Sequence, residues 1–301
     1  MASSGSGSAK KEIVPELQAF VDARGLPALF FFVNEPLESW HVIRVQALME
    51  DHKFDELDLV INSGGGSIDS AFQIAELLRL HTKKLNACVP FYAKSAATLL
   101  CISADEIILD DLAQLGPLDA QVLEGKRNGR GQFVSALNPF KALEQLQLFS
   151  LAALSAAFTM IDNRTDLSVD DCMKHAIEFV RATSAPMFGQ LNPEKLGEYS
   201  RALNVGKEYG DRLLRRFSKL DEKKRSEILE KLVHGYPSHD YIIDLHELTE
   251  MGLQAKLLSS EERKTTDKLF EYFRGQRRIL ECVLPSKPAS NPHDKKEGGK
   301  P

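Results

Sequence analysis

Residues 89–122, VPFYAKSAATLLCISADEIILDDLAQLGPLDAQV, decide the fold. An apolar run of strand length ends in this stretch and gives way at Ser95 to an apolar helical pattern. Residues 57–78, LDLVINSGGGSIDSAFQIAELL, repeat the arrangement with three glycines at the junction, Gly64, Gly65 and Gly66. Two successive strand-to-helix turns with short connections are typical of βαβ units in a parallel sheet.

The flanking sequence extends this α/β pattern and then becomes helical. The apolar positions of residues 139–162 run nearly all round a helix, which predicts either burial or an oligomer contact. Residues 125–131, GKRNGRG, are expected to form a solvated basic loop. Strands are predicted over 28–34, 57–62, 85–91, 106–109 and 113–115, and helices over 12–23, 36–49, 95–103, 139–162, 168–183, 195–217, 222–233, 244–251 and 265–280.

Composition sets limits on the class of protein. The 301 residues are 43% hydrophobic and 27% charged, the usual globular mix, and a net charge of −5 argues against general nucleic-acid binding.

The four cysteines show no paired or metal-ligand spacing, so we expect reduced thiols and no metal site. The N-terminus has no apolar core, and no apolar run approaches the ~20 residues of a membrane span, so we expect a cytoplasmic protein. Residues 1–10 and 286–301 are predicted to be disordered, leaving one domain over 11–285 with a helical insertion at about 139–233.

The glycines suit an acyl-transfer site. A tetrahedral oxyanion needs backbone N–H donors aimed at one point, and residues without a Cβ allow that close approach. A tight βα turn or a phosphate site is the alternative. A Walker loop is excluded because no GK[ST] follows, and the dinucleotide fingerprint fails because Asp69 stands where its last glycine is required.

Ser95 has small neighbours, Ala93, Ala96 and Ala97, which would let a substrate carbonyl reach its hydroxyl. A serine here is also a good helix N-cap, so this segment alone leaves both interpretations open. Adjacent turns of a parallel sheet lie side by side at the carboxyl ends of its strands, where such sheets build their sites. The two turns together therefore favour a serine hydrolase.

These motifs closely resemble the serine dehydrogenase proteinase family of Clp-fold serine peptidases, which is related to Clp protease and signal peptide peptidases. The resemblance rests on SGGGS, YAKSA, ADEI and LGPLD in order, and it returns at residues 232–253 with LVHGYPSHDYII and LTEMGL. It implies a crotonase-like spiral of βαβ units, a helical C-terminal half and assembly into homo-oligomers. This chain departs from the family pattern at Ala97, where Gly is common, and at Phe91, where His is frequent.

The resemblance also implies roles for individual residues. Ser95 takes the position of the nucleophile, and the oxyanion hole would combine the amide of Ala96 with that of Gly65 or Gly66. In a triad of the order Ser, Asp, His, the orienting acid maps to Asp119 and the base to His239.

A second candidate base is Lys141, because related Clp-fold proteases use a Ser–Lys dyad. Such a lysine must be desolvated to lose its proton, and Leu137, Phe140 and Leu143 could desolvate it. Lys94 is expected to point away from Ser95 across the strand end. The choice between His239 and Lys141 stays open.

We therefore predict a serine peptidase that needs no cofactor or metal, acts on a peptide or protein and forms a homo-oligomer. The alternatives are an acyl-CoA hydratase or hydrolase on the same scaffold, which would need an acidic base, and an inactive scaffold that binds partners. We expect no nucleic-acid partner and no membrane span.

Overall fold

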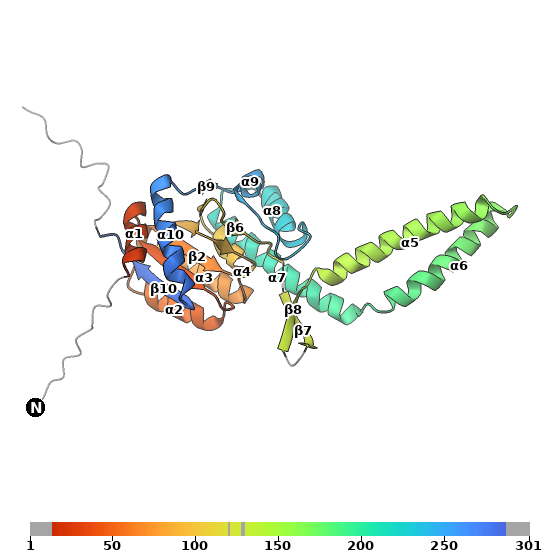
Figure 1. The fold of residues 1–301 in the computed structure, drawn as a ribbon, viewed down its shortest axis with the longest axis horizontal. Coiled ribbons are helices and arrows are strands. Elements are labelled where there is room, and N and C mark those ends of the chain that lie inside the picture. Colours follow the sequence, from red (N-terminus) through yellow and green to blue (C-terminus); the bar gives the residue numbers. More distant parts are fainter. Residues whose placement is uncertain (1–13, 120, 128–129, 287–301) are drawn as a thin grey trace, which may run out of the picture. The chain divides into compact units, whose positions relative to one another are not determined.

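The computed structural model describes residues 14–119, 121–127 and 130–286 (Figure 1). The predicted disordered ends, 1–10 and all but Ser286 of 286–301, lie outside these residues. The chain divides into two compact units, which we describe separately. The first comprises Met1–Leu118, Tyr209–Glu230 and His239–Pro301, and the second comprises Asp119–Glu208 and Lys231–Ser238.

The first unit is built on a mostly parallel sheet in the order β10-β1-β2-β3-β5-β9. Only β10 runs antiparallel to its neighbour β1, and the remaining adjacent pairs on this path are parallel. The strands are β1 (Ala28–Val33), β2 (Phe54–Ser63), β3 (Thr82–Val89), β5 (Glu106–Leu109), β9 (Ala255–Leu257) and β10 (Arg278–Val283).

The sheet curls at the carboxyl end of β2. There Ser63 pairs with Ala93 of β4 (Tyr92–Ala93), and β4 pairs in turn with β6 (Gln114–Leu115). The result is a curled, parallel half-barrel of βαβ units. This confirms the predicted Clp/crotonase-like α/β fold with a helical C-terminal half.

Helices cover both faces of this sheet. The side chains of Phe30 and Phe32 join a buried cluster with α1 (Pro15–Arg24) and α10 (Ser260–Arg274). Phe31 points to the opposite face, where its ring contacts His41 of α2 (Ser39–Met49). The other two helices that follow strands of the half-barrel are α3 (Ile68–His81) and α4 (Ala96–Ile102). All of β1 is buried, as its continuous apolar run predicted.

Two predicted segments were wrong. The helix expected over 265–280 is α10, which ends at Arg274, and β10 begins at Arg278. Gly275 ends the helix, and the residues from Arg278 onward then pair as β10 with the outer edge of β1. The predicted loop 125–131 lies largely in a hairpin of β7 (Gln121–Arg127) and β8 (Arg130–Ser135), while 128–129 lie outside the described residues.

In the second unit, α5 (Asn138–Asp162) and α6 (Val169–Phe188) pack along each other as a helical hairpin (Figure 1). α5 is mostly exposed, so the burial expected as one alternative for 139–162 does not occur within this chain. It is also the one helix among the described residues that is long and apolar enough to cross a membrane, judged by length and composition only. Polar residues such as Gln147 and Ser150 interrupt its apolar positions, which is why no continuous apolar run is visible in the sequence.

The remaining helices are α7 (Pro193–Phe217), α8 (Glu222–His234) and α9 (Leu245–Glu250). They lie close to the predicted boundaries 195–217, 222–233 and 244–251.

Candidate active site

Ser95 forms the turn between β4 and α4, and its backbone is strained. Its φ of 51° makes it the only non-glycine residue with a positive φ in the described part of the chain. The two residues that follow Ser95 are the small Ala96 and Ala97, both fully buried, so neither places a bulky side chain beside the serine hydroxyl. Strain of this kind costs about 1–3 kcal/mol and persists where the surrounding structure over-determines it, often at functional sites.

The hydroxyl of Ser95 does not cap the helix. Ser95 occupies the N-cap position of α4, yet its side chain makes no capping hydrogen bond, and within the described residues the hydroxyl has no hydrogen-bond partner. The N-cap interpretation therefore does not explain why a serine stands in this strained turn.

The glycine turn lies directly against the Ser95 turn. A Cβ built on Gly65 would stand 2.6 Å from the carbonyl oxygen of Lys94 and 3.0 Å from the amide nitrogen of Ala96. Gly65 and Gly66 also have φ of 95° and 143°, which side-chain-bearing residues rarely adopt. Close approach and backbone conformation both require glycine, as the adjacent-turn argument expected.

The structure distinguishes the amides of this turn. The N–H of Gly65 donates to the hydroxyl of Ser63 at 3.2 Å. The amides of Gly66 and Ala96 have no hydrogen-bond partner within the described residues. These two donors are therefore the ones left available to an anionic ligand, whereas sequence reasoning left Gly65 and Gly66 equivalent.

Lys94 anchors the serine turn to the loop that carries His239. Its ammonium donates to the side chain of Gln114 at 2.8 Å and to the backbone oxygens of Leu115 and Tyr241 at 3.1 and 3.2 Å. Burial lowers the pKa of Lys94, and the charge of Asp240 acts in the opposite direction.

A reciprocal pair of backbone hydrogen bonds, at 2.9 and 3.0 Å, joins Leu115 to Ile243 and strengthens the same connection. His239, which is half-buried, therefore belongs to a loop that is held at Tyr241 to Lys94, the residue after β4, and at Ile243 to Leu115 of β6.

Asp119 and Lys141 belong to the second unit. Asp119 is 1% exposed and accepts a 2.5 Å hydrogen bond from the hydroxyl of Ser135, which itself accepts from the amide of Leu137. The side chain of Lys141 is 51% exposed and pairs with Glu144 at 3.4 Å. That exposure does not supply the desolvation that a lysine base requires.

Sequence reasoning missed two residues at this site. The hydroxyl of Ser63 accepts a hydrogen bond from the amide of Gly65, and the carbonyl oxygen of Ser63 accepts one from the amide of Lys94 at 3.0 Å. Leu37 lies along the glycine turn from the other side, with its amide 2.8 Å from the oxygen of Gly65. Ser63 stands in the motif and could have been found there, but Leu37 lies in a remote segment with no distinguishing signal.

No group of three or more His, Cys, Asp or Glu side chains among the described residues could hold a metal ion. Cys88 and Cys101 are fully buried, and burial raises the pKa of the Cys88 thiol well above its usual value. The four thiols are all free.

The curled parallel sheet and its paired serine and glycine turns have the architecture of a ClpP/crotonase-like fold. Residues 18–130 match the family model of the ClpP-like SDH-type serine proteinases. The match confirms the resemblance inferred from the motifs, and it extends to the N-terminal side of residue 57, where that resemblance was loose.

Two proteins of Methanocaldococcus jannaschii are distant relatives, both described as uncharacterized. The chain is 28% identical to protein MJ0137 over 259 residues, which cover 86% of this chain and 72% of that relative. It is 27% identical to protein MJ1495 over 232 residues, which cover 76% of this chain and 61% of that relative. The chain thus spans about two thirds of the length of these relatives.

Proposed function

We propose that the protein is a serine peptidase in which Ser95 is the nucleophile. The observation that carries this proposal is the strained Ser95 turn packed against Gly65, with amides at Gly66 and Ala96 that have no partner in the described part of the chain. Preorganised N–H donors of this kind are typical of oxyanion holes, and removing one donor costs roughly 10²–10³ in rate.

The chemistry follows from these groups. The Ser95 oxygen forms a bond to the carbonyl carbon of a peptide and gives its proton to the base, while the amides of Gly66 and Ala96 bind the oxyanion. Collapse breaks the C–N bond, and the base returns the proton to the leaving amine. Water then attacks the acyl ester by the same steps and releases Ser95.

His239 is the base that the first unit offers. Its loop is held to the Ser95 turn by the hydrogen bond from Lys94 to the backbone oxygen of Tyr241, and an imidazole nitrogen can accept the serine proton. Asp119 as orienting acid and Lys141 as an alternative base complete the set of candidates, with Lys141 disfavoured by its exposure. One observation favours the alternative of an inactive scaffold, namely that no base among the described residues is hydrogen-bonded to the Ser95 hydroxyl.

The test is labelling with a fluorophosphonate probe, which reacts only with an activated serine. We expect the wild type to be labelled and Ser95→Ala to be silent, while Ser238→Ala, a change in an exposed loop serine, keeps full labelling. His239→Gln or Lys141→Gln, whichever abolishes labelling, identifies the base. A folded wild type that no fluorophosphonate labels would overturn the peptidase proposal and leave the scaffold.

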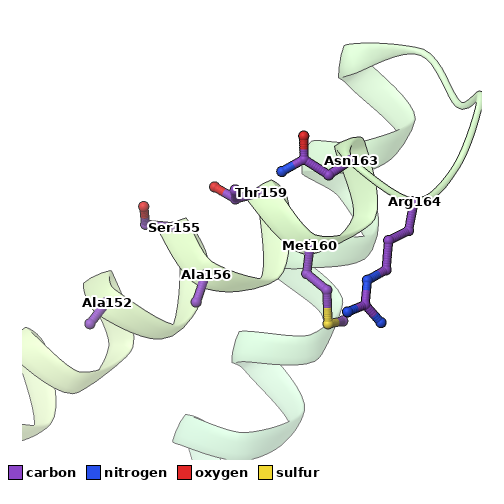
Figure 2. A pocket seen from close by; sticks show the side chains of 7 residues that line it. All are labelled: Ala152, Ser155, Ala156, Thr159, Met160, Asn163 and Arg164. Carbon is purple, nitrogen blue, oxygen red and sulfur yellow. The ribbon is translucent and has the colours of Figure 1, made fainter.

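We further propose that the α5–α6 hairpin pairs with a second copy of the chain. Large apolar side chains are exposed along both helices: Leu148, Phe149, Leu151, Met160, Val169, Met173, Ile177, Phe179 and Met187. The small residues Ala152, Ser155 and Ala156 line an open groove on α5 together with Thr159, Met160, Asn163 and Arg164 (Figure 2). An isolated two-helix hairpin of this kind has little core, and a second hairpin would complete a four-helix bundle.

Charges on α6 suit such a self-pairing. Asp171, Lys174, Glu178 and Arg181 recur at helical spacing, so they line one stripe of alternating sign. Under a two-fold axis at the level of Ala176, an antiparallel copy places Lys174 opposite Glu178 and Asp171 opposite Arg181.

Sedimentation velocity of the full chain tests this arrangement. Lys174→Glu should weaken self-association by roughly tenfold, because symmetry removes each attraction twice, and the swap Lys174→Glu/Glu178→Lys should restore it. Gln145→Glu and Gln147→Glu on α5 control for added charge. A wild type that stays monomeric, or that binds neutral lipid vesicles instead, contradicts the self-pairing.

A further inference from the structure

His41 is a buried histidine whose imidazole holds the chain next to the glycine turn. It is 0% exposed, and its Nδ1 accepts a hydrogen bond from the backbone N–H of Glu38 at 3.0 Å. A backbone amide can only donate, so this bond forms in the tautomer whose Nδ1 carries no proton, in which the imidazole is neutral with its proton on Nε2. His41 thus acts at the third position of α2 as a Glu or Gln does in a capping box.

The residue before Glu38 makes the contact with the glycine turn. The amide of Leu37 donates to the oxygen of Gly65 at 2.8 Å, and the amide of Ser67 donates to the oxygen of Leu37 at 2.9 Å. A Cβ on Gly66 would stand 2.2 Å from the nitrogen of Leu37, so the two backbones touch. The glycine turn is therefore held between Leu37 on one side and the Ser95 turn on the other.

The surroundings of His41 keep it neutral. Burial lowers its pKa, while Glu35 and Glu38 act to raise it and the guanidinium of Arg278 on β10 lowers it further. The Nε2 atom is buried, has no hydrogen bond to any residue that the structure describes, and lies 3.9 Å from a carboxylate oxygen of Glu35. The aromatic rings of Trp40 and Phe31 contact the imidazole.

We propose that His41 is a positioning residue for the oxyanion turn and that only its neutral form holds the turn in place. The inference rests on the proposed function of Gly66 and Ala96. A protonated Nδ1 would instead donate to the carbonyl oxygen of Glu38, 3.2 Å away, and would leave the Glu38 amide without its acceptor. The Leu37–Glu38 segment would then loosen, and with it the alignment of the Gly66 amide.

The pH profile of fluorophosphonate labelling separates this role from a purely structural one. For the wild type, we expect the logarithm of the labelling rate to fall with a slope near one as the base protonates. The slope should steepen toward two at lower pH, where His41 protonates as well. His41→Gln, which keeps an acceptor that does not titrate, should show a slope near one throughout. His41→Leu, which has no acceptor, should label about tenfold more slowly than the wild type at neutral pH, less than the loss from removing an oxyanion donor outright.

His52→Gln is the matched control, because His52 lies in the same unit ahead of β2, at the opposite end of that strand from the glycines. It should behave as the wild type. Equal profiles for wild type and His41→Gln would contradict the proposal.

A second measurement does not depend on activity. In NMR spectra of the full chain, the amide signals of Gly65 and Gly66 should titrate together with the His41 ring in the wild type and stay constant in His41→Gln. Glycine amides that do not move while His41 titrates would overturn the positioning role. If no variant is labelled at any pH, the peptidase proposal fails, and the NMR result still decides whether His41 controls the turn.

Discussion

The Cβ of Ser95 would lie 2.9 Å from a Cβ built on Gly65, so the serine turn and the glycine turn are in direct contact. That approach leaves no room for a side chain at Gly65. It also means that the two turns cannot move independently, because a shift of either one displaces the backbone of the other.

Gly65→Ala should therefore abolish fluorophosphonate labelling and lower the free energy of unfolding by roughly 1–3 kcal/mol, through steric overlap and a positive φ. Gly64→Ala is the matched control, since a Cβ there meets nothing within 4 Å and its φ is not in the positive region. Labelling kinetics and urea unfolding measure the two effects. Equal behaviour of the two variants would contradict the close packing of the turns.

Lys94→Met should release the loop that carries His239, because it removes hydrogen bonds to Gln114, Leu115 and Tyr241. We expect faster hydrogen exchange at residues 239–243 and, if His239 is the base, slower labelling. Lys83→Met removes a lysine whose side chain is 83% exposed and should change neither quantity. Unaltered hydrogen exchange in Lys94→Met would show that the backbone pairing of Leu115 with Ile243 is sufficient to hold the loop without Lys94.

The sequence predicted most of the half-barrel because its strands are continuous apolar runs and its turns carry Gly and Ser at the junctions. The strand β10 was missed because its residues, RILECV, follow α10 after only three residues, and their apolar positions continue the helical spacing. The role of Leu37 depends on contacts between segments that are distant in the sequence, so no local sequence pattern indicates it. The hydrogen bond that occupies the Gly65 amide is equally invisible without coordinates.

Arg24 of α1 forms a buried ion pair with Asp58 of β2, an interior strand of the sheet, and we expect this pair to be important for stability. Its guanidinium binds Asp58, whose side chain is 0% exposed, at 2.7 and 3.0 Å, and Glu262 at 2.7 Å. Arg24→Ala leaves the Asp58 carboxylate buried without its cation, so we expect a loss of about 3–5 kcal/mol. The exposed pair of Lys83 and Asp55 is the comparison, and Lys83→Ala should cost less than about 1 kcal/mol. Urea unfolding at neutral pH measures both, and similar losses would contradict the difference in burial.

The same network should make stability depend on acid. Burial acts to raise the pKa of Glu262, but hydrogen bonds from the Ser259 backbone and from Arg24 outweigh it, so the pKa lies below its usual 4.5. A carboxylate whose pKa is lower in the folded state binds fewer protons there than in the unfolded chain. Its contribution is therefore fully present above about pH 4.5 and is lost as the pH falls through the folded pKa. Glu262→Gln should lower stability at pH 7 and flatten the dependence between pH 5 and 3. A variant whose stability falls as steeply as that of the wild type in this range would assign the acid sensitivity to other carboxylates.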